Sequence, residues 1–297
     1  MSPTPRSLIL DLLSTLRSGS MPVRALVQAG ALFGLDGNAV RVALARLCAA
    51  GQVESLQRGH YRLGAGAEAI QREVVAWRGS RRATRRWDGA WIAMLPPGAK
   101  GGRERDARGR GLAQPGRARH ERALRLAGLR PLTAGLSVRP DNLEAGLQGA
   151  RARLLALGIW PGSAVFRALD LGPELEARAR DLWPIRELRV AYRRSRQMLV
   201  LSRKRLAHAD REEAMVESFL LGGRVIRQLV LDPLLPEEIL DPAGYRALVR
   251  EMREYDRFGR RCWADFMREW GVLGSRAPAH GPASDWLGHP PAAGGRA

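Results

Sequence analysis

Residues 34–63 read GLDGNAVRVALARLCAAGQVESLQRGHYRL, and this stretch decides the fold of the N-terminal part of the chain. Apolar residues recur at helical spacing through its first half, between Asn38, which can cap a helix, and Gly51, which can close one. The second half alternates roughly between apolar and polar residues around an Arg58-Gly59 turn. It therefore predicts a helix followed by a small β-hairpin.

Two more helices precede this stretch. Residues 7–17 place leucines at helical spacing behind Ser7, and a second helix begins near Pro22 and ends at Gly34. Three helices with a tight turn before the third are typical of a helix-turn-helix, and the hairpin at residues 52–63 adds a wing. The sequence therefore predicts a winged helix-turn-helix over residues 1–66.

A helical wheel of the third helix separates an apolar face from a face that could meet DNA. Its core face contains Val40, Ala43, Leu44 and Leu47. The opposite face has small residues at its centre and arginines at its edges, a shape that can enter a major groove. The predicted DNA-binding residues are Asn38, Arg41, Val42, Ala45 and Arg46 on this helix and Arg58, His60 and Arg62 on the wing. The alternative is a helical subdomain with two solvated arginines.

The charge of the chain points to a polyanionic partner. Its 297 residues carry a formal charge of +19, and residues 1–140 contain 24 of the 49 Lys and Arg but only 9 of the 30 acidic residues. Such an excess on one half is typical of nucleic-acid binding. Nearly all of these cations are Arg, which suits phosphate and base contacts, although a GC-rich genome produces the same bias.

The sequence argues against several other classes of protein. Two cysteines, Cys48 and Cys262, are too few for a disulfide framework or a cysteine zinc site, and no apolar run approaches the roughly 18 residues of a membrane span. Asp11 interrupts the first apolar stretch, which argues against a signal peptide. Nucleotide-binding, hydrolase and metalloprotease motifs do not occur, and the five histidines are scattered. We therefore expect a soluble cytoplasmic protein that is not an enzyme and has no metal or cofactor.

The rest of the chain changes pattern twice. The strand WDGAWIAML begins at Trp87, and after a Gly- and Arg-rich loop at 97–118 the periodicity gives helix, strand, strand, helix, strand, a βαββαβ order. Amphipathic helices follow from residue 183, with Leu188 to Leu206 and Leu248 to Trp270 as apolar stripes. The predicted class is α+β. Its predicted divisions are the winged helix at 1–66, a basic linker helix at 67–86, a central domain at 87–172, a helical C-terminal domain at 173–272 and a disordered tail at 273–297.

Short motifs along most of the chain resemble the PaaX family of bacterial transcriptional regulators, which repress aromatic-acid catabolism. They are AVRVALARL (39–47), Gly51, RGHYRL (58–63), WDGAW (87–91), Pro140 and DPLLPEEIL (232–240). The resemblance implies a winged helix, a ferredoxin-like central domain similar to that of small CRISPR-associated nucleases, and a helical C-terminal domain. It also implies a homodimer that binds double-stranded operator DNA at the bacterial nucleoid and is released by an acyl-CoA effector such as phenylacetyl-CoA.

Two departures and two alternatives accompany this resemblance. Asp241-Pro242-Ala243-Gly244-Tyr245 stands where the family usually has Trp-Pro-Gly, and the basic insert before residue 118 is longer than usual. The effector site stays unknown, with Arg189 and Arg193 as weak candidates for holding CoA phosphates. The main alternative is a nucleic-acid-processing protein whose central domain binds or cuts DNA or RNA, with Asp88 as the candidate catalytic acid, while the winged helix only docks it. A nonspecific architectural DNA binder is the other.

Overall fold

The structure is a computed structural model that describes residues 3–16, 19–57, 59–77, 83–97 and 114–272. Contacts between Cα atoms group the chain into two compact units. The first contains the described residues of 1–78, 191–230 and 245–287, and the second contains those of 79–190 and 231–244. Each unit combines helices with a small antiparallel sheet, so the fold is α+β, as predicted.

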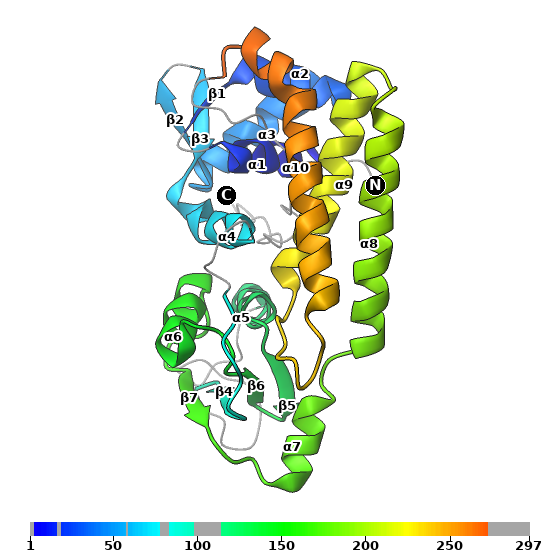
Figure 1. The fold of residues 1–297 in the computed structure, drawn as a ribbon. Helices are drawn as coiled ribbons and strands as arrows, with labels where there is room; N and C mark the ends of the chain where they lie inside the picture. The colour runs from blue at the N-terminus through cyan, green and yellow to red at the C-terminus, as the bar shows by residue number, and fades with distance from the viewer. Residues whose placement is uncertain (1–2, 17–18, 58, 78–82, 98–113, 273–297) are drawn as a thin grey trace, which may run out of the picture. The chain divides into compact units, whose positions relative to one another are not determined.

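The N-terminal part of the first unit has three helices and a hairpin where the periodicity predicts them (Figure 1). A short additional strand, β1, pairs with the hairpin, so β3 lies in the middle of a three-stranded antiparallel sheet. The elements are α1 (Pro5–Thr15), β1 (Met21–Pro22), α2 (Val23–Leu32), α3 (Gly37–Ala49), β2 (Val53–Gln57), β3 (His60–Leu63) and α4 (Ala65–Ala76).

The starts of two helices differ from the prediction. Thr4 rather than Ser7 caps α1, because the two side chains form a reciprocal capping box. Asp36 rather than Asn38 caps α3, and one of its carboxylate oxygens accepts hydrogen bonds from the backbone N–H groups of Asn38 and Ala39, both at 2.9 Å. A carboxylate two residues earlier reaches these free N–H groups, so Asn38 lies inside the helix.

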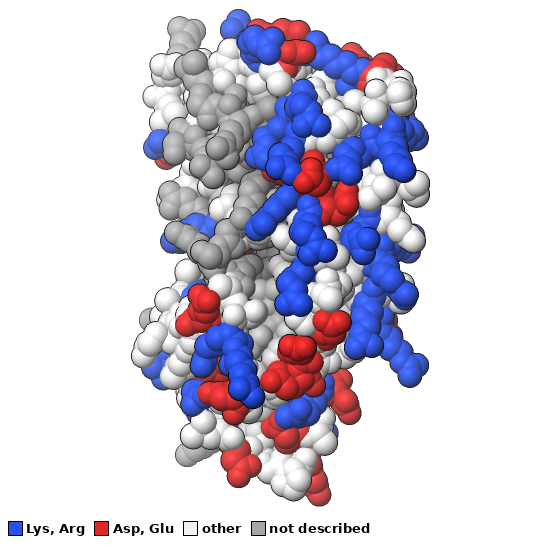
Figure 2. All heavy atoms as spheres, viewed as in Figure 1, with Lys and Arg blue, Asp and Glu red and all other residues white. Residues whose placement is uncertain are grey.

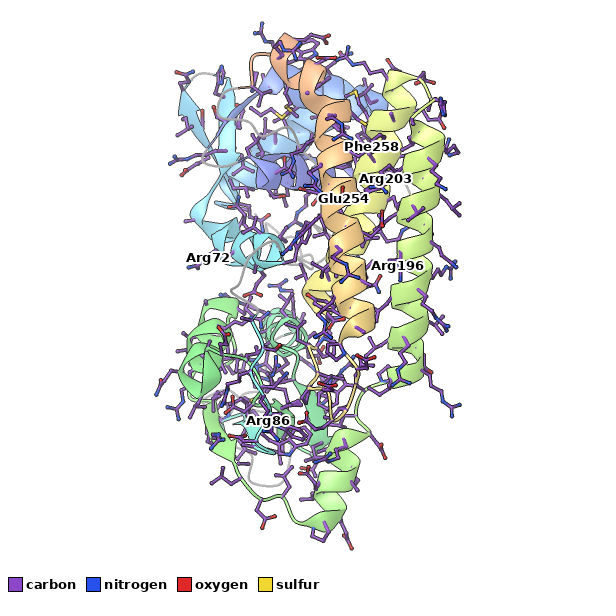
Figure 3. All side chains as sticks on the ribbon, in the orientation of Figure 1. Arg72, Arg86, Arg196, Arg203, Glu254 and Phe258 are labelled. Carbon is purple, nitrogen blue, oxygen red and sulfur yellow. The ribbon has the colours of Figure 1, made fainter. Side chains whose placement is uncertain are left out.

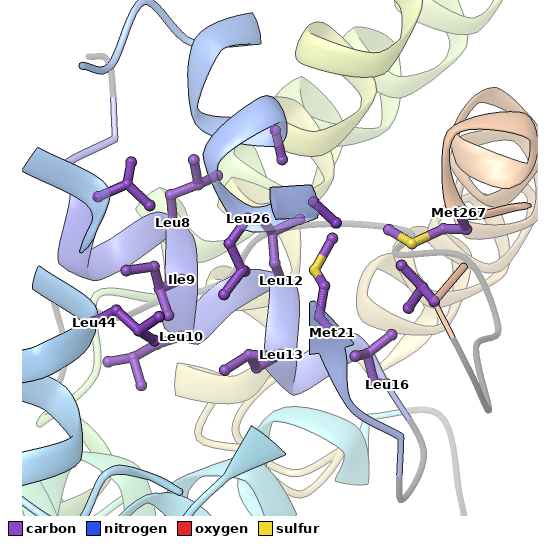
Figure 4. Close-up of a cluster of buried hydrophobic side chains, with 14 of the residues drawn as sticks. Leu8, Ile9, Leu10, Leu12, Leu13, Leu16, Met21, Leu26, Leu44 and Met267 are labelled. Carbon is purple, nitrogen blue, oxygen red and sulfur yellow. The ribbon is translucent and has the colours of Figure 1, made fainter. Parts of the chain in front are cut away.

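Three long helices complete the first unit: α8 (Ile185–Leu206) from residue 191 onward, α9 (Arg211–Leu231) as far as residue 230, and α10 (Ala243–Glu269) from residue 245 onward. Apolar side chains of α9 and α10 enter the same core as those of α1–α3. Phe219 on α9 lies between Phe33 and Trp263, with ring centroids 5.3 and 5.6 Å apart, and Met267 reaches the region of Met21 (Figure 4). Residues separated by more than 180 positions therefore bury one another.

The second unit contains the βαββαβ order that the sequence predicts. Its strands are β4 (Trp91–Leu95), β5 (Arg130–Thr133), β6 (Leu136–Pro140) and β7 (Ala164–Ala168), and its helices are α5 (Gln114–Ala127), α6 (Gly146–Leu157) and α7 (Pro173–Arg180). The sheet order is β5-β6-β4-β7, and every neighbouring pair is antiparallel.

The DPLLPEEIL segment has a structural role in this second unit. Asn142 donates a side-chain hydrogen bond of 2.7 Å to the carbonyl of Leu234, and Arg139 donates to the side chain of Asn142 and to the carbonyl of Ala127. Arg139, Asn142 and Leu234 are all buried. Since a buried guanidinium needs such partners, the network holds this segment against the C-terminal end of β6.

Candidate nucleic-acid interface

Helix α3 presents the face that the sequence assigns to DNA. Val40, Leu44 and Leu47 are buried and Ala43 is half-buried, which places the apolar stripe against α1 and α2. The five predicted contact residues of this helix are all exposed: Asn38, Arg41, Val42, Ala45 and Arg46. Val42 is 43% exposed and stands out because a valine at the centre of a polar face has no packing role there.

The neighbouring helix α2 holds α3 closely. A Cβ atom added to Gly30 would lie 2.8 Å from Cγ2 of Val40, closer than real Cβ atoms approach other atoms. After both helices a glycine with positive φ reverses the chain, Gly34 at 71° and Gly51 at 64°. The turn between α2 and α3 is therefore short and tightly packed, which fixes the direction of α3.

The electrostatics of this face are those of an anion-binding surface. Neither Arg41 nor Arg46 forms an ion pair with any residue that the structure describes. Asp36 is the acid nearest to Arg41 in the sequence, and its carboxylate accepts hydrogen bonds from the α3 N-terminus. Two unpaired guanidinium groups flanking small apolar residues can donate hydrogen bonds to bases or phosphates.

The hairpin differs from the prediction in detail. Arg62 forms an ion pair with Glu54 of the facing strand, so its charge is partly compensated. His60 is half-buried opposite Pro22. Arg58 lies outside the described residues, as do most of the Gly- and Arg-rich loop and the 273–297 tail. Leu56, which the sequence reasoning did not single out, is 48% exposed on β2, and its alternation with buried Val53 is a weak signal for it.

Asp88, the candidate catalytic acid of the nuclease alternative, lies in an ion-pair network. Asp88 pairs with Arg167, and buried Asp141 binds Arg85 and Arg167, each at 2.9 Å. A hydrogen bond from the Ala90 N–H and the charge of Arg167 lower the pKa of Asp88. Within the described parts of the chain, no group of three His, Cys, Asp or Glu could hold a metal ion. This arrangement gives no support to the nuclease alternative.

Arg189 and Arg193, the candidates for an effector site, are both exposed on α8. Exposed guanidinium groups on the outer face of a helix do not enclose a ligand by themselves. Their proposed role in effector binding stays a prediction. None of the described helices combines the length and apolar character required to span a membrane.

Comparisons with known proteins agree with this geometry. Among solved structures, the chain is similar to an uncharacterized protein from Mycobacterium tuberculosis, with 24% identity and a TM-score of 0.54, covering 90% of this chain and 99% of the other. That similarity concerns the fold alone. Comparison with the curated proteins gives no match. Residues 4–67, which contain α1–α3 and the hairpin, match the family described as PaaX-like protein. Over this segment the chain is similar to the PaaX-like family, in agreement with the resemblance that its motifs predict.

Proposed function

We propose that the chain is a sequence-specific DNA-binding transcriptional regulator that uses a winged helix-turn-helix. The observation that carries this proposal is the exposed face of α3, on which unpaired Arg41 and Arg46 flank Val42 and Ala45. The match of residues 4–67 to a regulator family supports it. In this reading α3 enters the major groove and the hairpin lies along the backbone or in the minor groove.

The chemistry of α3 suggests a role for each side chain. Arg41 and Arg46 can donate two hydrogen bonds to guanine O6 and N7, and Asn38 can bind adenine. Val42 and Ala45 fit the methyl group of thymine, which explains an exposed valine there. Arg62 and His60, together with Arg58, are proposed to contact phosphates, since the partner Glu54 leaves part of the Arg62 guanidinium exposed.

The finer parts of the function rest on the family resemblance. We propose a homodimer that represses a catabolic operon and is released by an acyl-CoA such as phenylacetyl-CoA, with the βαββαβ unit as a ferredoxin-like domain. A single α3 reads few bases, and two copies would read half-sites about 34 to 36 Å apart or a multiple of that distance. The effector must bind the DNA-free geometry more tightly, since equal affinity would shift nothing.

Substitution of Arg41 tests the proposal. The Arg41→Ala protein is compared with wild type at fixed salt, on DNA from upstream of its own gene and on a random-sequence duplex of equal length. We expect a loss of discrimination of about 1 to 3 kcal/mol, because a base contact is removed. Arg117→Ala on α5 removes the same charge from an arginine paired with Glu121 and serves as the matched control.

Two outcomes would contradict the proposal. If Arg41→Ala keeps the selectivity of wild type, α3 does not read the bases. If wild type itself binds both duplexes equally, with steep salt dependence, the nonspecific architectural function is favoured instead.

A further inference from the structure

Helix α10 carries a row of arginines along its solvent face. Residues 246, 250, 253, 257, 261 and 268 are all arginines and all exposed. Their spacing of three, four or seven positions places them on one side of the helix. From Arg246 to Arg268 the row extends over about 33 Å at 1.5 Å per residue. In Figure 2 the basic side chains form a column along this helix.

The opposite side of α10 fixes the orientation of the row. Leu248, Met252, Tyr255 and Trp263 are fully buried in the first unit. The long apolar stripe therefore holds α10 by packing along its length. Because this packing fixes the rotation of α10 about its axis, the arginines on the opposite face point away from the core.

The acidic residues of α10 do not neutralise the row, because most of them face the neighbouring helices. Arg203 of α8 lies 3.2 Å from Glu251 and 3.9 Å from Glu254 where α8 meets α10 (Figure 3), and Arg211 of α9 lies 3.0 Å from Glu269. Within the row, Arg257 also contacts Glu254, and Arg268 contacts Asp265. Arg246, Arg250 and Arg261 form no ion pair with any residue in the described ranges.

The composition of this face indicates which partner it fits. Exposed large hydrophobic side chains occur elsewhere among the described residues, for example Leu201 on α8, but not on α10. A protein interface or a membrane-inserting helix needs exposed large apolar or aromatic anchors, and α10 has none among its exposed residues. A straight row of guanidinium groups about 33 Å long matches roughly one turn of duplex DNA, and Arg binds phosphate in bidentate geometry.

We propose that the arginine row of α10 binds the phosphate backbone of duplex DNA as a second contact surface, separate from α3. This inference rests on the proposed function, because it adds a nonspecific contact to a specific one. The row increases affinity for every DNA sequence and the number of phosphates neutralised, while α3 provides the selectivity.

The test uses the full chain with Arg246, Arg250 and Arg261 replaced together by Ala. Binding is measured on a random-sequence duplex of about one and a half turns and on one of about four turns, over a range of salt concentrations. Loss of three phosphate contacts is expected to reduce the slope of log affinity against log salt by about 2 to 3. At low salt we expect at least a tenfold loss of affinity for both duplexes. The ratio of affinities for DNA from upstream of its own gene and random DNA stays that of wild type.

Two control variants separate the row from net charge and from folding. The triple substitution of the same arginines by Lys keeps the charge, and it is expected to retain most of the affinity. Replacement of Arg194, Arg196 and Lys204 on α8 by Ala removes the same charge from another exposed surface of the first unit. It is expected to change the salt slope much less. Thermal unfolding of every variant confirms that the fold is intact.

Each outcome either supports or overturns the inference. If the α10 variant kept the DNA affinity and the salt slope of wild type, the inference would be overturned, and the arginine row would bind a different anionic partner. Equal losses in the α8 and α10 variants would overturn it too, because the effect would then come from net charge. The random-sequence measurements do not depend on base reading by α3, so a failure of the proposed function would appear separately, as wild type without sequence preference.

Discussion

At the scale of single residues, Tyr255 is a buried titrating group whose pKa departs strongly from its ordinary value. It is fully buried, and its hydroxyl lies 2.7 Å from the Ser202 hydroxyl, which in turn donates to Glu217. Burial raises the pKa of Tyr255 to about 12, while the Ser202 hydrogen bond and the charge of Arg205 act in the opposite direction. The nearby Cys262 also contributes to raising this pKa. The folded protein therefore keeps this phenol neutral at pH values where the unfolded chain ionises it.

Stability should consequently fall at high pH. The ordinary tyrosine pKa is 10, so between pH 10 and about 12 only the unfolded state releases this proton. We expect the free energy of unfolding of wild type to decrease by about 1.4 kcal/mol per pH unit in this window, relative to Tyr255→Phe. Urea unfolding of both proteins at pH 9, 10.5 and 11.5 measures the difference. If the free energy of unfolding depended on pH in the same way in both proteins, Tyr255 would not be the cause of the loss of stability.

At the scale of elements, the start of α3 depends on one carboxylate. Asp36 satisfies two N–H groups at the N-terminus of the helix that is proposed to read DNA. Asp36→Ala is expected to lower the free energy of unfolding by about 0.5 to 2 kcal/mol, because these groups lose their partner. Urea unfolding of the full chain measures the change.

A conservative variant separates the cap from the charge. Asp36→Asn keeps an oxygen that can accept the same hydrogen bonds and should retain most of the stability. If Asp36→Asn loses as much as Asp36→Ala, the negative charge near the helix dipole, rather than the cap, stabilises α3.

At the scale of the whole molecule, the N-terminal helices depend on residues far along the chain. Phe219 and Trp263 are fully buried against α1–α3, and the indole of Trp263 donates to the Met215 carbonyl at 3.0 Å. Phe219→Ala is therefore expected to cost about 3 to 5 kcal/mol and to weaken DNA binding by unfolding the helices that carry α3. Leu201→Ala on α8 removes an exposed leucine and should stay within about 0.5 kcal/mol of wild type. Thermal unfolding and DNA binding are measured for both variants. If Phe219→Ala and Leu201→Ala had equal effects, the shared core would be contradicted.

The shared core also predicts how a chain without its C-terminal helices behaves. We expect a protein that lacks residues 183–297 to bind DNA weakly and to lose its response to an effector. The structure adds a reason, because the truncation removes Met215, Phe219, Trp263, Phe266 and Met267 from the core of α1–α3. A truncated chain with cooperative unfolding, full DNA affinity and an intact response would show that residues 1–182 suffice.

Local patterns in the sequence determined the elements and their faces. The apolar spacing from Val40 to Leu47 predicts which side of α3 is buried, and the alternation of strand and helix segments after Trp87 predicts the βαββαβ order. Both follow from the repeat of a helix or strand, which acts over a few residues. The cap at Asp36 was missed because Asn38 is an equally good capping residue by type, and only backbone geometry distinguishes them.

Tertiary structure alone decided how distant segments combine. Nothing in the local pattern of α9 or α10 indicates that Phe219 and Trp263 complete the core of α1–α3, since an apolar stripe does not specify its partner. The location of the unpaired charge is also decided by the tertiary structure. Residues 141–297 carry 25 Lys and Arg against 21 acidic residues, which hides the arginine row of α10. The row keeps unpaired charge because Arg203 and Arg211 of the neighbouring helices bind acids of α10, and that pairing exists only once the three helices pack.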